Sequence, residues 1–205
     1  MKSLFDRTRV YAYPAADGSG FSDDALNAAD GIVVSVRCEG SLPVPAECGF
    51  DDMDDLLRMC AERQLHLLLV LEDAPDAEAR KFLMTAVCRR EMVARLTLAS
   101  RHHRCLDEMK QAEPALRITP LCDDTLVRPW IYAAYMGAPA YCTDAEALLR
   151  GADRFGCETV DRAHNANVCI FAENAEDADT VKALVSVGCD AVLTHDPVMA
   201  RALVW

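Results

Sequence analysis

Eight short apolar runs, separated by stretches of helical pattern, are the feature that most constrains how this 205-residue chain can fold. Each run is almost continuously apolar, which is typical of parallel strands that are covered by helices. The runs lie at residues 9–14, 31–37, 65–72, 95–100, 116–121, 138–142, 167–172 and 191–195. Strands that alternate with helices in this way predict an α/β fold, a compact (β/α)8 TIM barrel. A doubly wound open sheet is the alternative.

The segments between the runs carry helix signals. Apolar residues in 53–60 share one helical face, and Asp51 or Asp52 can cap that helix. Gly188 stands at the C-cap position of a later helix, and the tail 199–205 is either a final helix or a self-association patch. We expect a single barrel domain over residues 1–205, close to the lower size limit of such barrels.

Charge and composition exclude several classes of protein. The net charge of −12 argues against nucleic-acid or anionic-membrane partners, because both require a basic surface. No segment approaches the ~20 apolar residues of a membrane span, and the first residues do not resemble a secretory leader. The ten cysteines include no Cys-x-x-Cys pair and are expected to be small buried residues in a reducing cytoplasm.

Residues 160–197, VDRAHNANVCIFAENAEDADTVKALVSVGCDAVLTHDP, carry a specific pattern. An Ala-His pair precedes a strand that contains an aromatic residue and is followed by Asn, and a Gly-x-Asp then leads to Thr-His-Asp-Pro. The residues concerned are Ala163, His164, Phe171, Asn174, Gly188, Asp190, Thr194 and Pro197. This pattern resembles the last two βα units of the glycerophosphodiester phosphodiesterase family. Residues 95–121 resemble that family's Ser-ending strand, helix and Pro-preceded strand.

The resemblance implies a TIM barrel and cleavage of glycerophosphodiesters with a divalent cation and two histidines. The family's His-Arg-Gly at the end of the first strand falls on Tyr13, Pro14 and Ala15, so both the His and the Arg are replaced. The two acids that bind the metal at the second strand fall on Val33 and Ser35. Neither of these side chains can stand in for a carboxylate.

Two further family positions lie downstream. Ala46 stands at the place of the second histidine. The third acid falls near Glu72 and Asp73, but a one-residue register decides which of them faces the barrel mouth. Glu72 is then either the retained Glu or stands at the family's Lys place, with Val70 at the Glu place. At least two of three metal ligands and both histidines are therefore replaced, and we expect no resident cofactor.

Other polar residues at strand ends can bind a ligand. Arg101 and His102 belong to the dense basic segment SRHHRC, which is either a phosphate site or a polar loop and first helical turn. Arg37 is a second possible phosphate contact. His195 lies at a strand end, where its imidazole either binds a backbone group or contacts a ligand. Asp123 and Asp124 are more typical of helix N-caps than of catalytic acids.

Three hypotheses follow. In the first, the chain is a divergent member of this family that is inactive or altered, with a small phosphorylated polyol or phosphodiester as its ligand. In the second, a rebuilt site that uses Glu72, Asp73, His102 or His195, with Mg²⁺ or Ca²⁺, still hydrolyses glycerophosphodiesters. In the third, the chain is an unrelated barrel enzyme. The candidate ligand-binding residues are Tyr13, Ser35, Arg37, Glu72, Asp73, Arg101, His102, Asn174 and His195.

Overall fold

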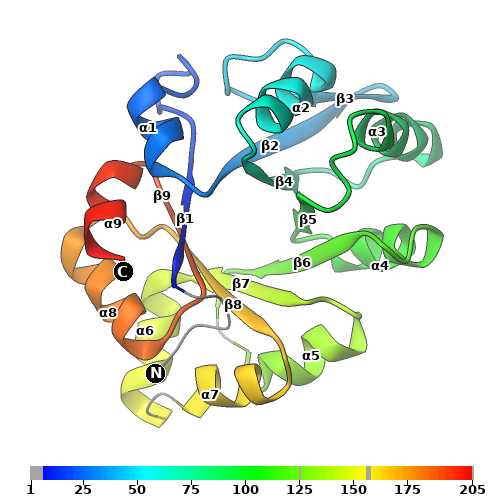
Figure 1. The fold of residues 1–205 in the computed structure, drawn as a ribbon. Coiled ribbons are helices and arrows are strands. Elements are labelled where there is room, and N and C mark those ends of the chain that lie inside the picture. Colours follow the sequence, from blue (N-terminus) through cyan, green and yellow to red (C-terminus); the bar gives the residue numbers. More distant parts are fainter. Residues whose placement is uncertain (1–6, 125, 156–157, 205) are drawn as a thin grey trace.

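The computed structural model describes residues 7–124, 126–155 and 158–204. Eight parallel strands close into a barrel, and helices surround it (Figure 1). The strands are β1 (Arg9–Ala12), β2 (Gly31–Glu39), β3 (Leu42–Pro45), β4 (His66–Leu71), β5 (Leu96–Ser100), β6 (Arg117–Cys122), β7 (Ala140–Asp144), β8 (Cys169–Glu173) and β9 (Ala191–Thr194). Because β1 pairs with both β9 and β2, the sheet is closed, and the predicted (β/α)8 barrel is confirmed over the open sheet.

The helices follow the strands in the predicted alternation. They are α1 (Asp23–Ala28), α2 (Met53–Glu62), α3 (Ala77–Arg89), α4 (His103–Ala112), α5 (Pro129–Tyr135), α6 (Ala145–Phe155), α7 (Glu158–Asn165), α8 (Ala178–Val187) and α9 (Pro197–Leu203). Asp52, rather than Asp51, caps α2, and Gly188 ends α8 with a φ of 86°. The tail forms α9, while Trp205 lies outside the described residues.

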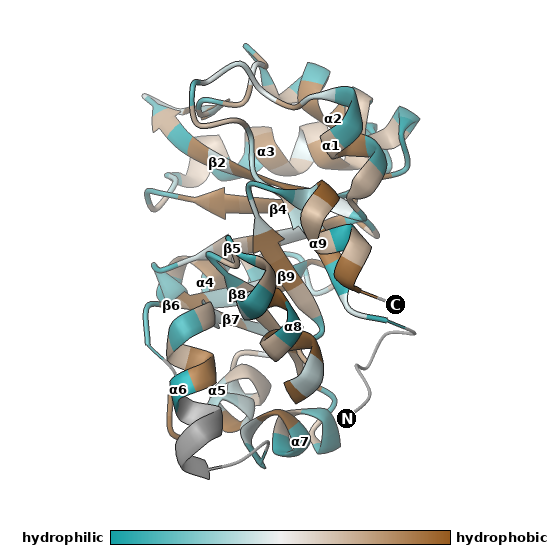
Figure 2. Ribbon diagram, turned by 90° about the vertical axis from the view of Figure 1, so that its left-hand side faces the viewer, coloured by the Kyte–Doolittle hydropathy of each residue, from teal (hydrophilic) through white to brown (hydrophobic). Residues whose placement is uncertain are grey.

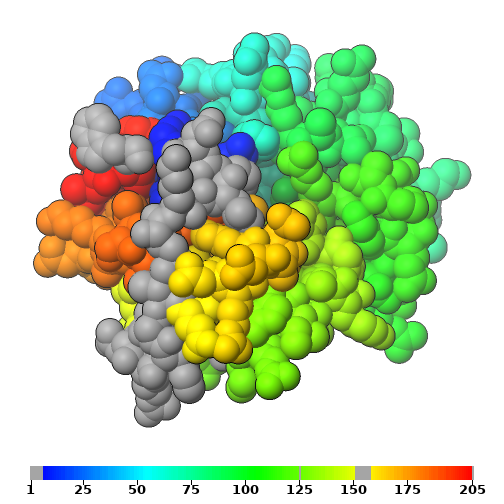
Figure 3. Space-filling view, turned by 60° about the horizontal axis from the view of Figure 1, so that its bottom comes forward, coloured from blue at the N-terminus to red at the C-terminus, as the bar shows by residue number. Residues whose placement is uncertain are grey.

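One strand departs from the parallel pattern. β2 extends beyond residue 37 and turns back into β3, which pairs with it antiparallel. The helices between described strands are short, as the chain length requires, and none is long and apolar enough to cross a membrane. On the outer surface, α5 and α7 pack side by side (Figure 3), with the Arg162 guanidinium 5.7 Å from the Trp130 ring centroid.

Alternate residues of each strand fill the barrel. Val33, Leu68, Ala99, Leu121 and Phe171 belong to one buried apolar cluster inside it. The intervening residues point outward into a second, larger cluster beneath the helices. Figure 2 shows this as apolar strands inside helices that carry hydrophilic residues. Both faces of each strand are therefore apolar, which explains the continuous runs in the sequence.

The seam between β1 and β2 requires a glycine. A Cβ atom on Gly31 would lie 2.6 Å from Tyr11 Cε1 and 2.6 Å from the carbonyl oxygen of His66. The absence of a side chain at Gly31 lets the Tyr11 ring pack directly over the backbone. The seam is thus closed by a close contact that only glycine allows.

Two residues that carry the family resemblance contact each other. His164 Nε2 on α7 lies 2.8 Å from Asp190 Oδ2, just before β9. The same carboxylate oxygen accepts the Ile170 N–H of β8 at 2.7 Å, and Asp190 is fully buried. The pair ties a helix to two strands, so these motif residues serve the architecture of the barrel.

Candidate functional site at the C-terminal mouth

The carboxyl ends of the eight barrel strands meet at one end of the barrel, which we call the C-terminal mouth. TIM barrels place their active sites at this end. The inward alternation of the strands brings polar residues to this rim. They are Tyr13, Ser35, Arg37, Glu72, Arg101, Asp123, Asp144, Glu173 and His195. Most of the residues named from the sequence therefore lie around one opening.

Arg101 is held between two carboxylates. Its Nε donates to Asp123 Oδ1 at 2.6 Å, and its Nη2 donates to Glu173 Oε1 at 2.7 Å. Asp123 therefore does not cap a helix as expected, because α5 begins at Pro129 with Arg128 in the N-cap place. Glu173 is only 7% exposed, and burial raises the pKa of its carboxyl. Arg101 therefore offers this mouth a guanidinium whose plane is already oriented by two carboxylates.

A second group lies where β1 and β9 meet at the rim, next to β8. The rings of Tyr13 and His195 stack with centroids 4.8 Å apart. His195 Nδ1 lies 2.9 Å from Glu176 Oε1, and its backbone N–H donates to Glu176 Oε2 at 3.0 Å. The expectation that the imidazole binds a backbone group is therefore wrong, because a carboxylate orients it. Asp196, the next residue, caps α9.

Burial raises the pKa of the Tyr13 phenol, and the carboxylates of Glu173 and Glu176 add to this shift while Arg101 opposes it. The phenol therefore stays protonated and can donate a hydrogen bond. Arg101 and Glu173 belong to the first group and Glu176 belongs to the second, and all three act on the Tyr13 phenol. The two groups therefore face a common space.

The remaining predicted residues have local roles. Asn174 has a φ of 63°, in the left-handed region that Asn tolerates, and its Nδ2 donates to Asp144 Oδ2 at 3.0 Å. His102 Nε2 lies 3.1 Å from the carbonyl oxygen of Glu72, so it closes the loop after β4. Arg37 and Asp73 are exposed.

Strand register shows which of Glu72 and Asp73 follows the inward face of β4. It is compatible with Glu72 at either the family's Glu place or its Lys place, because Val70 and Glu72 share that face. Ser35 pairs with Val70, and Val70 packs against the inner cluster. Glu72 therefore continues the inward alternation of β4, and Asp73 points away from it. Val33 is 2% exposed inside the barrel.

These side chains do not suit a divalent cation. Val33 and Val70 have no donor atom and Ser35 has only a hydroxyl, so the carboxylate of Glu72 stands beside them as a single ligand, too few for a divalent cation. Within the described ranges, no group of three His, Cys, Asp or Glu side chains is placed to hold a metal ion. The mouth can instead bind through a guanidinium, a phenol, an imidazole and several carboxylates.

No family model matches the sequence, and no curated protein matches it. Solved structures match it over almost the whole chain. A glycerophosphodiester phosphodiesterase from Parabacteroides distasonis has a TM-score of 0.75 at 14% identity, covering 98% of this chain and 97% of that one. One from Agrobacterium tumefaciens has a TM-score of 0.72 at 15% identity, covering 95% and 99%.

A phosphodiesterase from Oleispira antarctica, solved with its product sn-glycerol-3-phosphate, has a TM-score of 0.72 at 12% identity, covering 96% of each chain. The chain thus has the fold of the glycerophosphodiester phosphodiesterases, as the motifs in residues 160–197 predict.

Proposed function

We propose that this chain is a divergent barrel of the glycerophosphodiester phosphodiesterase type that binds a small phosphorylated polyol or a phosphodiester at its C-terminal mouth, without metal-dependent hydrolysis. One observation carries the proposal. Val33, Ser35 and Val70 occupy successive inward positions of β2 and β4, beside a mouth that still presents Arg101.

The contacts of Arg101 suit such a ligand. Asp123 is 81% exposed in its ion pair, so a phosphate group can replace it at little cost in free energy. A guanidinium binds phosphate oxygens through two parallel hydrogen bonds. Glu173 would keep Arg101 in place from the other side. The hydroxyls of a polyol would donate to carboxylates such as Asp144.

Without a general acid and a divalent cation at the family's positions, we expect no metal-dependent hydrolysis. A general acid typically contributes 10²–10⁴-fold to the rate of such a reaction. A divalent cation stabilises the charge that develops on the phosphoryl oxygens. Replacing the residues that supply both leaves binding as the function that the mouth supports.

A rebuilt hydrolase is the second candidate, because His195 and Glu176 form an oriented imidazole–carboxylate pair beside Tyr13. An imidazole whose other nitrogen is held by a carboxylate is a suitable general acid or base. This candidate requires turnover, and it predicts that Glu176→Gln abolishes it.

Calorimetric titration with glycerol 3-phosphate tests binding at the mouth. We expect saturable binding that Arg101→Gln weakens about tenfold or more, because a charge-assisted pair is lost. Arg58→Gln, which removes an exposed guanidinium paired with Asp55 on α2, is the matched control and should bind normally. Equal affinity in the Arg101→Gln variant would contradict the proposal.

Release of glycerol 3-phosphate from glycerophosphocholine, with and without Mg²⁺ or Ca²⁺, separates the two candidates. No turnover supports a binding protein, while turnover that is lost in Glu176→Gln supports the rebuilt hydrolase. We also propose that residues 1–205 form a single domain that works in glycerophospholipid metabolism in a reducing compartment such as the cytoplasm. The free thiols of the described cysteines are consistent with that location.

A further inference from the structure

Glu173 is a carboxylate of the C-terminal mouth that cannot withdraw from a ligand bound at Arg101. Its side chain is 10% exposed, whereas the side chain of Asp123, the other partner of Arg101, is 81% exposed. The two carboxylates accept from Nε and Nη2, which lie on one edge of the guanidinium. A phosphate group that replaces Asp123 on this edge therefore comes to lie directly beside Glu173.

One oxygen of Glu173 is left for such a ligand. Oε1 accepts from Arg101 Nη2 at 2.7 Å, while Oε2 has no hydrogen bond or ion pair within residues 7–124, 126–155 and 158–204. Oxygens with so little exposure are normally paired with protein or with water. A ligand that displaces water from the mouth must therefore supply a partner for Oε2. Phosphate oxygens accept hydrogen bonds, so Oε2 can pair with them as a carboxylic acid but not as a carboxylate.

The charges around Glu173 favour its neutral form. Asp144 on β7 stands opposite Glu173 on β8 in the strand register, about 4.8 Å away. Asp123, Asp144 and Glu173 thus place three negative charges around the single positive charge of Arg101. Although burial raises the pKa of Asp144, hydrogen bonds from Asn174 and from the backbone of α6 bring it below its usual value, so Asp144 keeps its charge.

The pKa of the Glu173 carboxyl is itself raised by burial. Arg101 opposes this shift, and Asp123 and Asp144 add to it. Other titratable groups near Glu173 bring it no unpaired charge, because three of them stay neutral through burial and the other two pair with each other. They are the Tyr13 phenol, the thiols of Cys122 and Cys142, and the pair of His195 and Glu176.

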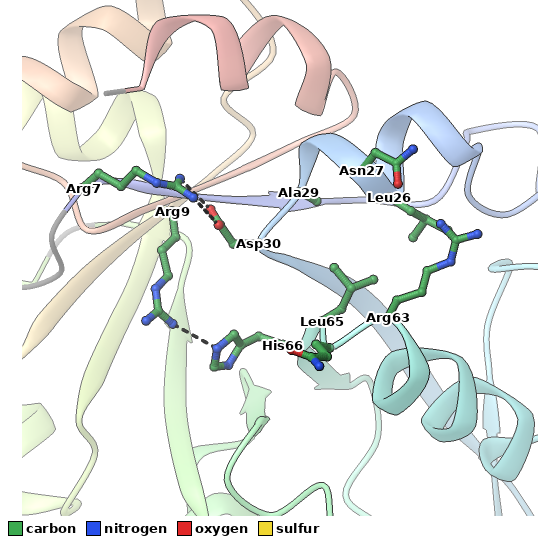
Figure 4. A pocket seen from close by; sticks show the side chains of 10 residues that line it. Arg7, Arg9, Leu26, Asn27, Ala29, Asp30, Arg63, Leu65 and His66 are labelled. Carbon is green, nitrogen blue, oxygen red and sulfur yellow. Dashed lines mark hydrogen bonds and ion pairs between the residues drawn. The ribbon is translucent and has the colours of Figure 1, made fainter.

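The opposite end of the barrel has the reverse balance of charge. A cavity of about 550 Å³ there is lined, among the described residues, by three arginines and one carboxylate, Asp30, to which Arg7 donates at 2.6 and 3.0 Å (Figure 4). Arg63 in the same wall lies 2.6 Å from Asp23. Each of these carboxylates contacts a guanidinium of its own, whereas three carboxylates share one at the mouth. Proton uptake on anion binding is therefore expected of the mouth.

We propose that Glu173 binds the ligand as a carboxylic acid, taking up one proton when a phosphate group reaches Arg101 and donating its Oε2–H to a phosphate oxygen. Oε1 continues to accept from Arg101. The proton comes from the solvent, and no bond of the ligand breaks. A second anion beside a buried carboxylate favours the neutral acid, and an O–H donor to a phosphate oxygen is a strong hydrogen bond. This inference rests on the proposed function, because it requires a phosphate group at Arg101.

Calorimetric titration with glycerophosphocholine, in buffers of different ionisation enthalpy, measures the protons taken up. The phosphodiester keeps one negative charge throughout the neutral range, so any uptake belongs to the protein. We expect uptake of up to about one proton per ligand, and an affinity that falls by up to about tenfold for each unit by which pH rises. Glu173→Gln keeps an acceptor for Arg101 and gains a permanent donor for the phosphate. It should bind without proton uptake and with little dependence on pH.

Infrared difference spectra of the parent protein, with its glutamate carboxyls labelled with carbon-13, give a second measurement that does not require the variant to fold. Binding of glycerophosphocholine should produce the carbonyl band of a protonated glutamic acid. Glu146→Gln is the matched control for the titrations, because Glu146 is 80% exposed and pairs with Arg150 at 3.7 Å on α6. It should take up as many protons as the parent.

Binding without proton uptake, uptake that persists in Glu173→Gln, or uptake without the glutamic acid band would overturn the inference. The proposed function would still stand in these cases if Arg101→Gln weakens the binding of glycerol 3-phosphate. Failure of glycerophosphocholine to bind would also overturn the inference. If glycerol 3-phosphate then fails to bind as well, or binds equally to Arg101→Gln, the proposed function fails with it.

Discussion

Replacing Asp190 with Ala should destabilise the barrel more than any change at its surface. The carboxylate is fully buried, lies 2.8 Å from His164 Nε2 and accepts the Ile170 N–H at 2.7 Å. Alanine leaves both of these partners without their acceptor. Each buried polar group that loses its partner costs about 1–3 kcal/mol. Removing one member of a buried pair typically costs about 3–5 kcal/mol in all.

A loss of about 3–5 kcal/mol is a large part of the roughly 5–15 kcal/mol by which a domain is stable. With a urea slope of about 2 kcal/mol per molar, the midpoint of unfolding should fall by about 1.5–2.5 M. Asp190→Asn keeps one acceptor oxygen for the Ile170 N–H, so its free energy of unfolding should fall by about half as much as that of Asp190→Ala. Circular dichroism during urea titration gives the unfolding midpoints of the parent protein, Asp190→Ala and Asp190→Asn.

Asp179→Ala is the matched control on neighbouring α8. Asp179 is 95% exposed and pairs with Lys182 at 3.4 Å, so its removal should cost less than about 0.5 kcal/mol. A loss below about 1 kcal/mol in Asp190→Ala would refute the assignment of the Ala-His and Gly-x-Asp motifs to the architecture of the barrel.

Three further perturbations test the barrel itself. Gly31→Ala should lower stability by about 1–3 kcal/mol, because its Cβ would lie 2.6 Å from both Tyr11 and the His66 carbonyl; an unchanged melting temperature would contradict the close seam. Leu68→Ala should cost about 2–5 kcal/mol, since Leu68 is fully buried inside the barrel, and a urea midpoint equal to that of the parent would contradict this packing. Burial raises the pKa of Cys60 from 9.0 to about 12, so the thiol ionises in the unfolded chain at a lower pH than in the folded protein. The free energy of unfolding should therefore fall as pH rises above about 9, by up to about 1.4 kcal/mol per pH unit. Equal urea midpoints at neutral and alkaline pH would contradict this prediction.

The strands could be predicted because burial on both faces leaves an unbroken apolar signal. The same signal does not show which residues of each strand face the interior of the barrel. The run at 65–72 is apolar on both faces, so the sequence alone could not tell whether Glu72 or Asp73 faces the mouth. The pairing of Ser35 with Val70 settled that question in the structure.

Loop residues of the site were harder to predict. Glu176, which orients His195, lies 19 positions before it, and loops have no periodicity that would mark such a partner. Asp123 was expected to cap a helix, but Pro129 fixes the first turn of α5 further along the chain. Asp123 was therefore left to pair with Arg101. The ends of the apolar runs predict which positions lie near the rim, but the sequence does not predict the partners of the side chains there.

β9 closes the barrel between β8 and β1, and it therefore determines when the barrel can be completed during folding. The Thr8 hydroxyl, just before β1, bonds the Cys189 carbonyl across 181 positions of the chain, and β9 pairs with β1 on one side and β8 on the other. During synthesis β1 emerges first and β9 almost last. Pairing across so long a loop is slow. Until it occurs, β1 and β8 present open edges that other chains can join, so the nascent barrel is most exposed to aggregation just before its last strand arrives.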